Sequence, residues 1–391
     1  MPTELRRDLG VVGAALIGLG SILGTGVFVV IGLGVAEIGS AILPAILVGG
    51  LVATCNGLNS AQLAANFPIA GGTYEYGYRL LTPAHGFTAG WMFLLAKSAS
   101  AATAALAIGR TLGGAEWMVP LALAVIVIMT LIIVGGLKRT NTVNAVIIAV
   151  TLLALLWFSA LGLGSSAPIV RQPCSFGQFL EMCALVFVGY TGYGRIATMG
   201  EEIKQPRKNI PTAMILTLAA SAVLYAGVAW AELKGVGYPV IWRIGEVTAL
   251  LGVLLNLILG LSRILFAMGR RADMPALFGA VTTASQPRNA VLGVVVLIAL
   301  LILLGDIKLA WSFSAFTVLI YYAICNLAAL QLNAKQRLYS RGLGYLGLVS
   351  CLFLAFWVDW KVWLVGLLMI GLGLFWLRQR KQAIFQRLRD E

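Results

Sequence analysis

The sequence predicts an all-α polytopic membrane protein with about twelve transmembrane helices. Of its 391 residues, 60% are hydrophobic and only 11% are charged, whereas a soluble globular domain carries about 25% charged residues. The apolar residues form continuous runs, which are typical of spanning helices, whereas the strands of a membrane β-barrel alternate over about ten residues. These two observations define the fold class.

Twelve apolar runs, bounded by charges and turn residues, are the candidate spans. They cover approximately residues 9–35, 41–65, 86–110, 118–136, 143–164, 176–200, 211–231, 247–268, 290–305, 309–332, 342–356 and 362–377. About 20 helical residues cross the hydrocarbon core of a bilayer, so the runs at 290–305, 342–356 and 362–377 are short. No room remains for a soluble domain, and we expect residues 1–391 to form a single membrane domain.

Basic residues predict how the chain lies in the membrane. If both termini are cytoplasmic, nineteen Lys and Arg residues fall in cytoplasmic segments and six in external ones. The positive-inside rule therefore predicts a multi-pass protein of the cell (plasma or inner) membrane with both termini cytoplasmic. The net charge of +13 is explained by these loops, so no nucleic-acid partner is expected. The basic tail 378–391 is expected on the anionic inner leaflet.

The sequence contains no pattern typical of a metal or cofactor site. Its five cysteines are scattered without a CxxC pair, and its single histidine, His85, lies at a span boundary. It has neither a His, Cys and carboxylate constellation nor a nucleotide-binding loop. We therefore expect no cofactor, no bound metal and no enzymatic activity.

Glycines interrupt the first span at its centre. The stretch Gly18-Leu-Gly-Ser-Ile-Leu-Gly-Thr-Gly26 holds four glycines in nine residues, and each glycine destabilises a helix by about 1 kcal/mol relative to Ala. A break at membrane depth exposes N–H and C=O groups, which is tolerated where they line a cavity or meet a ligand. Alone, the Gly20 and Gly24 pair more often indicates close helix packing.

A second interrupted span favours the broken-helix interpretation. Span six contains Phe187-Val-Gly-Tyr-Thr-Gly-Tyr-Gly194, five spans after the first break. Matched breaks predict an inverted repeat of about 9–164 and 176–332. Half-helix N-termini attract an anionic group and exposed carbonyls attract a cation, so the paired breaks suit a zwitterionic amino acid.

Four stretches carry a resemblance to a known family. They are Gly20-Ser-Ile-Leu-Gly-Thr-Gly-Val-Phe28, Pro68-Ile-Ala-Gly-Gly-Thr-Tyr74, Gly200-Glu-Glu-Ile-Lys-Gln-Pro-Arg-Lys-Asn-Ile-Pro211 and Ser262-Arg-Ile-Leu-Phe-Ala-Met268. In this order and spacing the chain resembles the amino acid–polyamine–organocation (APC) transporter superfamily over about residues 9–380. It resembles in particular the bacterial cationic-type and L-type amino acid transporter branches. The resemblance implies a LeuT-like five-plus-five fold with two extra helices at about 342–377, and a single membrane transport domain.

The resemblance also implies which residues bind the substrate. In similar proteins the substrate carboxylate binds N–H groups of the first break, and its ammonium binds carbonyls of both breaks. The corresponding positions here are Gly24, Thr25 and Gly26 for the carboxylate, and Ile22, Val188, Gly189 and Thr191 for the ammonium. Val188 takes the position of a gating aromatic residue, so Phe187 and Tyr190 are the gating candidates here.

Two residues are candidates for coupling transport to an ion. Thr151 takes the position at which cationic-type relatives have a span-five lysine. Lys97 lies inside span three, where an ionisable side chain is costly and is a functional candidate by default. It could replace a coupling cation, carry the coupled proton, or have only a structural role by pairing with carbonyls or snorkelling.

The predicted function is secondary active transport of an amino acid by alternating access, proton-coupled or by exchange. No Asp or Glu lies in the middle of a confident span, and a cationic side chain would need such a partner. This absence favours a neutral amino acid, although Lys97 leaves an anionic one open. The alternatives are an amino acid receptor or sensor on the same scaffold, and a cationic amino acid or polyamine transporter.

Overall fold

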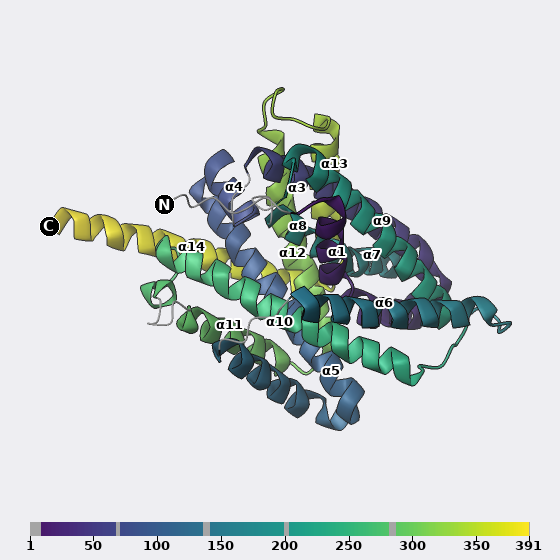
Figure 1. The fold of residues 1–391 in the computed structure, drawn as a ribbon. Helices are drawn as coiled ribbons and strands as arrows, with labels where there is room; N and C mark the ends of the chain where they lie inside the picture. Colours follow the sequence, from purple (N-terminus) through teal and green to yellow (C-terminus); the bar gives the residue numbers. More distant parts are fainter. Residues whose placement is uncertain (1–8, 68–70, 136–140, 199–202, 281–286, 391) are drawn as a thin grey trace.

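A computed structural model describes residues 9–67, 71–135, 141–198, 203–280 and 287–390. Within these ranges the elements are helical, and the one extended pairing is a bridge between Leu9 and Ile203 (Figure 1). Seven of the described helices are long and apolar enough to cross a membrane. The predicted all-α polytopic class is therefore confirmed.

The helices follow the predicted spans closely. Span one is divided into α1 (Val11–Ile22) and α2 (Ile31–Ile38), and span six into α7 (Phe176–Tyr190) and α8 (Gly194–Thr198). The other helices are α3 (Ile42–Asn66), α4 (Thr73–Leu80), α5 (Pro83–Val134), α6 (Asn141–Gly164), α9 (Pro206–Leu233), α10 (Val240–Arg270), α11 (Arg288–Ile302), α12 (Ile307–Leu330), α13 (Arg341–Ala355) and α14 (Trp360–Asp390). The motif residues 68–70 and 200–202 lie outside the described ranges.

Helix α5 contains both span three and span four. Its 52 residues would be far too long for one crossing at 1.5 Å per residue. At Gly114 the backbone turns at φ 69° and ψ −165°, a conformation that favours glycine. Gly109 lies directly against the carbonyl of Met118 on the other side of this turn, so the two arms of α5 run back along each other.

The last helix extends beyond the predicted span. Residues 378–390 continue α14 as a helix past the predicted span of 362–377. Figure 1 shows α14 (yellow) extending from the bundle to the C-terminus. The predicted span ends at residue 377 because the apolar run gives way to basic residues there. A change from apolar to charged residues ends a span but need not end a helix.

The halves of span one pack along the halves of span six. Helix α1 contacts α8 and α2 contacts α7. Gly18 of α1 lies against Ile196 of α8, and Gly34 of α2 faces the sulfur of Met182 in α7. This pairing brings the interrupted centres of the two spans together in the middle of the bundle.

A buried amide chain fixes α3 to α12 beside these spans. Asn59 Nδ2 donates to Asn326 Oδ1 at 2.7 Å, and Asn326 Nδ2 donates to Asn56 Oδ1 at 2.6 Å. All three side chains are fully buried. Satisfied polar groups of this kind fix helix register inside a membrane protein, because an unpaired amide there would be costly.

Candidate functional site at the two helix breaks

The first break leaves two N–H groups at the start of a half-helix. Helix α1 ends at Ile22, Leu23 is extended at φ −76° and ψ 91°, and the N–H groups of Val27 and Phe28 bond the Gly24 carbonyl at 3.1 and 3.0 Å. The N–H groups of Thr25 and Gly26 therefore lie in the first turn of the next helix, where intrahelical acceptors are lacking. Among the described residues neither N–H has an acceptor.

The side chain of Thr25 adds a third unsatisfied group at this break. Thr25 is only 4% exposed, and its hydroxyl has no hydrogen-bond partner in the described part of the chain. A helix N-terminus carries a partial positive charge and offers N–H donors to an anion. The first break therefore presents donors suited to a carboxylate.

The second break is a short turn of 3-10 helix between α7 and α8. This turn, η3 (Thr191–Tyr193), follows directly on the last residue of α7. The Thr191 hydroxyl donates to the Val188 carbonyl at 2.7 Å. The Val188 carbonyl, near the C-terminal end of α7, therefore accepts from both the hydroxyl and the backbone N–H of Thr191. The partial negative charge of a helix C-terminus favours a cation.

The two breaks are in direct contact through glycine. A Cβ atom added at Gly26 would lie 2.7 Å from the Cα of Gly189, and one added at Gly192 would collide with the carbonyl of Ser21. Real Cβ atoms do not approach a neighbour so closely. Glycine at these positions allows the two backbones to meet.

Tyr225 of α9 connects the two breaks, and the sequence contains no motif that marks it. Its hydroxyl lies 3.2 Å from the Ile22 carbonyl and 3.0 Å from the Gly189 carbonyl, so its single proton is shared between both breaks. Tyr225 is fully buried, with its ring 4.9 Å from that of Tyr190. These carbonyls are two of those predicted to bind a substrate ammonium.

Lys97 reaches the second break from α5. Its Nζ donates to the Thr191 hydroxyl at 2.8 Å, which in turn donates to the Val188 carbonyl. Within the described ranges Lys97 forms no ion pair with a carboxylate. The ammonium therefore lies close to the C-terminal end of α7, where the helix dipole stabilises positive charge.

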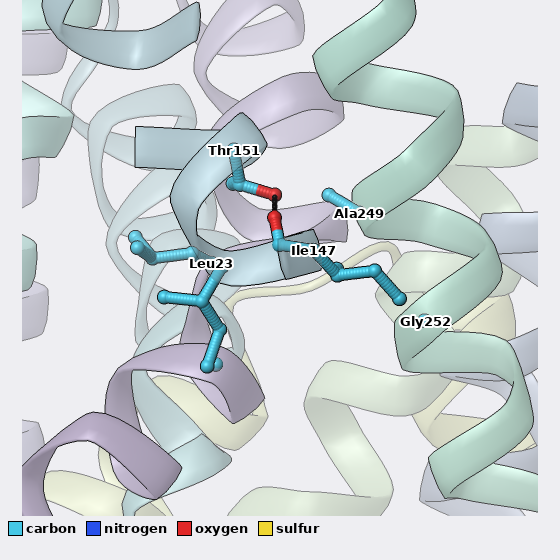
Figure 2. A pocket seen from close by; sticks show the side chains of 7 residues that line it. Leu23, Ile147, Thr151, Ala249 and Gly252 are labelled. Atoms are coloured by element: carbon cyan, nitrogen blue, oxygen red, sulfur yellow. Dashed lines mark hydrogen bonds between the residues drawn. The ribbon is translucent and has the colours of Figure 1, made fainter. Parts of the chain in front are cut away.

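Thr151 lies beside the first break, in a different place from Lys97. It lines a cavity of about 10 Å³ together with Gly20, Leu23, Ala249 and Gly252 (Figure 2). That volume is about enough for one water molecule. The Thr151 hydroxyl donates to the Ile147 carbonyl at 2.8 Å, so the two predicted coupling residues are not brought together.

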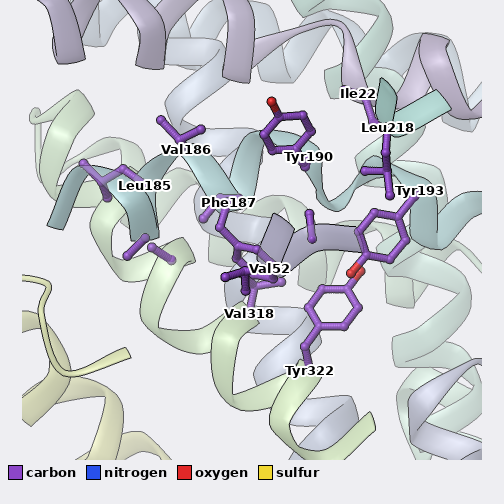
Figure 3. Close-up of a cluster of buried hydrophobic side chains, with 14 of the residues drawn as sticks. Ile22, Val52, Leu185, Val186, Phe187, Tyr190, Tyr193, Leu218, Val318 and Tyr322 are labelled. Carbon is purple, nitrogen blue, oxygen red and sulfur yellow. The ribbon is translucent and has the colours of Figure 1, made fainter. Parts of the chain in front are cut away.

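The gating candidates Phe187 and Tyr190 are both fully buried. Phe187 meets the ring of Tyr322 edge to face at 5.8 Å, and the Tyr190 hydroxyl donates to the Ile46 carbonyl at 3.3 Å (Figure 3). Tyr322 also donates to the Thr191 carbonyl at 3.4 Å. The aromatic side chains therefore hold the second break against α3 and α12.

No group of three acidic, His or Cys residues in the described ranges could hold a metal.

Comparison with known proteins identifies the family of this chain. A family model described as amino acid permease matches residues 13–239 and 228–385. An uncharacterized transporter of Mycobacterium tuberculosis is 35% identical, covering 95% of this chain and 91% of its own. A branched-chain amino acid permease of Bacillus subtilis is 27% identical over 97% and 94% of the two chains, and a methylthioribose transporter of the same organism 28% identical over 71% and 70%. The chain belongs to the amino acid permease family of the APC superfamily, whose members are multi-pass membrane transporters.

Proposed function

We propose that this protein is a secondary active amino acid transporter that works by alternating access. The observation that supports this proposal most directly is the contact of Gly26 with Gly189. Beside it lie the N–H groups of Thr25 and Gly26, which have no acceptor among the described residues. Donors for a carboxylate and carbonyls for an ammonium thus lie next to each other. An α-amino acid carries the matching pair of charges on adjacent atoms.

The substrate ammonium would take the place of the Tyr225 hydroxyl at the carbonyls of Ile22 and Gly189. In the present arrangement this hydroxyl satisfies both carbonyls. An ammonium offers three donors and forms stronger, charge-assisted hydrogen bonds. Exchange of one donor for the other changes how tightly the two breaks are held, which supports a role in alternating access.

The proposed side chain is neutral. The described carboxylates lie away from the two breaks: Glu37 and Glu181 pair with Lys308 near the ends of their helices, and Glu246 accepts from Thr111. A cationic side chain buried near the breaks would have no anionic partner there. A cationic amino acid or polyamine is accordingly the less favoured alternative.

Lys97 is proposed as a built-in cation at the second break. Half-helix C-termini bind coupling cations in transporters with broken helices, and here the ammonium of Lys97 already lies at this end of α7 through Thr191. Transport would then be proton-coupled or by exchange, without a metal ion.

We further propose that residues 9–164 and 176–332 form two inverted repeats. The protein would lie in the cell membrane with both termini cytoplasmic, an orientation that the distribution of Lys and Arg supports.

Counterflow in proteoliposomes tests the proposal. Vesicles loaded with an unlabelled amino acid should accumulate the same labelled amino acid transiently, for a neutral amino acid more than for arginine or lysine. A thermal-shift screen of the twenty amino acids on purified protein chooses the substrate, because a ligand of the native state stabilises it. Stabilisation without counterflow would instead favour an amino acid sensor on the same scaffold, and preference for arginine would contradict a neutral substrate.

A further inference from the structure

A second polar cavity lies where α7, α12 and the connector between α13 and α14 meet. Its volume is about 310 Å³, and it shares no lining residue with the two breaks. Six residues carry its chemistry: Glu181, Asp306, Lys308, Ser312, Trp357 and Asp359. Asp306 and Lys308 lie at the start of α12, and Trp357 and Asp359 lie between α13 and α14, so the cavity is at the ends of these helices.

The charges around this cavity are unbalanced. Lys308 Nζ lies 2.9 Å from Glu37 Oε2 and 3.3 Å from Glu181 Oε1, so its one positive charge is divided between two carboxylates. Asp306 accepts the N–H of Leu309 at 2.9 Å, and Asp359 accepts that of Lys361 at 2.8 Å. Neither of these aspartates has a cationic partner among the described residues. The lining therefore favours a positively charged group.

Ser312 adds a hydroxyl to the lining of the cavity. The residue is only 2% exposed, and its hydroxyl forms no hydrogen bond to another described residue. Because Ser312 lines the cavity, a ligand there would satisfy it. The ring of Trp357 supplies an apolar wall beside the charged groups.

We propose that this cavity binds a molecule in which a primary ammonium lies close to an anionic group. The carboxylates of Asp359 and Glu181 take the ammonium, and Lys308 and the Ser312 hydroxyl take the anion. A free amino acid has this chemistry, and so does the phosphoethanolamine headgroup of a lipid. The first source rests on the proposed transport function; the second does not. In either case the ligand competes with Lys308 for Glu181 and loosens the tie between α12 and α7.

Equilibrium binding to the purified full-length protein tests the site. The probes are labelled leucine and labelled O-phosphoethanolamine, with wild type compared with Ser312→Ala and Asp359→Asn. Each variant removes one ligand contact, and the loss of about one charge-assisted hydrogen bond corresponds to roughly tenfold weaker binding. Ser312→Ala removes no hydrogen bond of the protein itself, so the melting temperature should not change. Glu116→Gln, which removes an exposed carboxylate in the connector between the arms of α5, is the matched control and should bind as wild type.

The outcomes separate this site from the transport site. Leucine binding weakened by both variants identifies a free amino acid as ligand, and phosphoethanolamine binding weakened alone identifies a lipid headgroup. Binding of both probes unaffected by the two variants, or no binding of either probe to wild type, overturns the proposal. Counterflow reports on the transport site instead: Gly26→Val should abolish it while leaving phosphoethanolamine binding intact. Failure of the transport proposal therefore remains distinguishable from failure of this one.

Discussion

Lys97 Nζ and the hydroxyl of Thr191 lie 2.8 Å apart, which ties the first arm of α5 to the break between α7 and α8. The same hydroxyl donates to the Val188 carbonyl, so two consecutive hydrogen bonds connect the ammonium on α5 to the C-terminal end of α7. A movement of η3 relative to α5 must break this hydrogen bond or carry Lys97 with it. The contact is therefore a point at which the charge of Lys97 and the geometry of the site can influence each other.

Replacing Lys97 should impair transport more than folding. In Lys97→Met the ammonium is lost while an apolar stem remains, so the end of α7 loses its cation and Thr191 its donor. We expect initial uptake in proteoliposomes to fall by about tenfold or more, corresponding to roughly 1.4 kcal/mol, and its dependence on pH to change. Lys361→Met, which removes an exposed lysine at the start of α14, should leave both unchanged. A wild-type rate and pH profile in Lys97→Met would leave Lys97 with a structural role only.

Adding a single methyl group at the contact of the two breaks should be severely disruptive. In Gly26→Ala the new Cβ would meet both the Tyr225 hydroxyl and the Cα of Gly189. Overpacking of this kind typically costs about 1–3 kcal/mol, and here it also separates the donors of one break from the carbonyls of the other. We expect substrate-induced thermal stabilisation and counterflow to be lost. Gly371→Ala, at a position in α14 with open space around it, should behave as wild type, and normal counterflow in Gly26→Ala would contradict the proposed contact.

Removing the Tyr225 hydroxyl should lower the melting temperature of the ligand-free protein and increase its stabilisation by the substrate. In Tyr225→Phe the carbonyls of Ile22 and Gly189 lose their shared donor, and an unsatisfied buried acceptor costs about 1–3 kcal/mol. The ligand-free protein should therefore melt at a lower temperature. The substrate should raise that temperature by more than in wild type, because its ammonium no longer displaces a hydroxyl. Tyr345→Phe, at an exposed position of α13, is the control. An equal or smaller ligand-induced shift in Tyr225→Phe would argue against competition at these carbonyls.

The sequence predicts most of the fold but only part of the site. Glycine clusters and apolar runs are local signals, so they locate both breaks and the helices around them. Tyr225 gives no local signal, because a tyrosine in an apolar run is equally typical of ordinary packing. The sequence also does not predict the hydrogen-bond partner of Lys97, because Thr191 lies 94 positions away in the chain. Only the packing of α5 and α9 against span six brings these side chains to the breaks.

A buried aspartate just after the C-terminal end of α10 also has no sequence signal. Asp273 is 5% exposed and accepts hydrogen bonds from the hydroxyls of Tyr74 and Tyr78 in α4, at 2.5 and 2.7 Å. The indole of Trp376 in α14 donates to the Asp273 carbonyl at 2.8 Å. Three segments that are distant in the chain therefore meet at one residue outside the spans.

This cluster should make the protein sensitive to alkaline pH. Burial, and then the hydrogen bond to Asp273, raises the pKa of both tyrosines above their ordinary value. A group with a raised folded-state pKa stabilises the native state fully below its unfolded pKa, about 10 for tyrosine, and loses this contribution as the pH rises through the folded value. The melting temperature of wild type should thus fall above about pH 10. In Tyr78→Phe it should fall less steeply. This variant should already be less stable at neutral pH by about 1.5–3 kcal/mol, because it loses a hydrogen bond to a charged group. Tyr345→Phe should follow wild type throughout. If Tyr78→Phe and wild type lose stability with the same slope above pH 10, Asp273 does not hold the protonated tyrosines as the structure indicates.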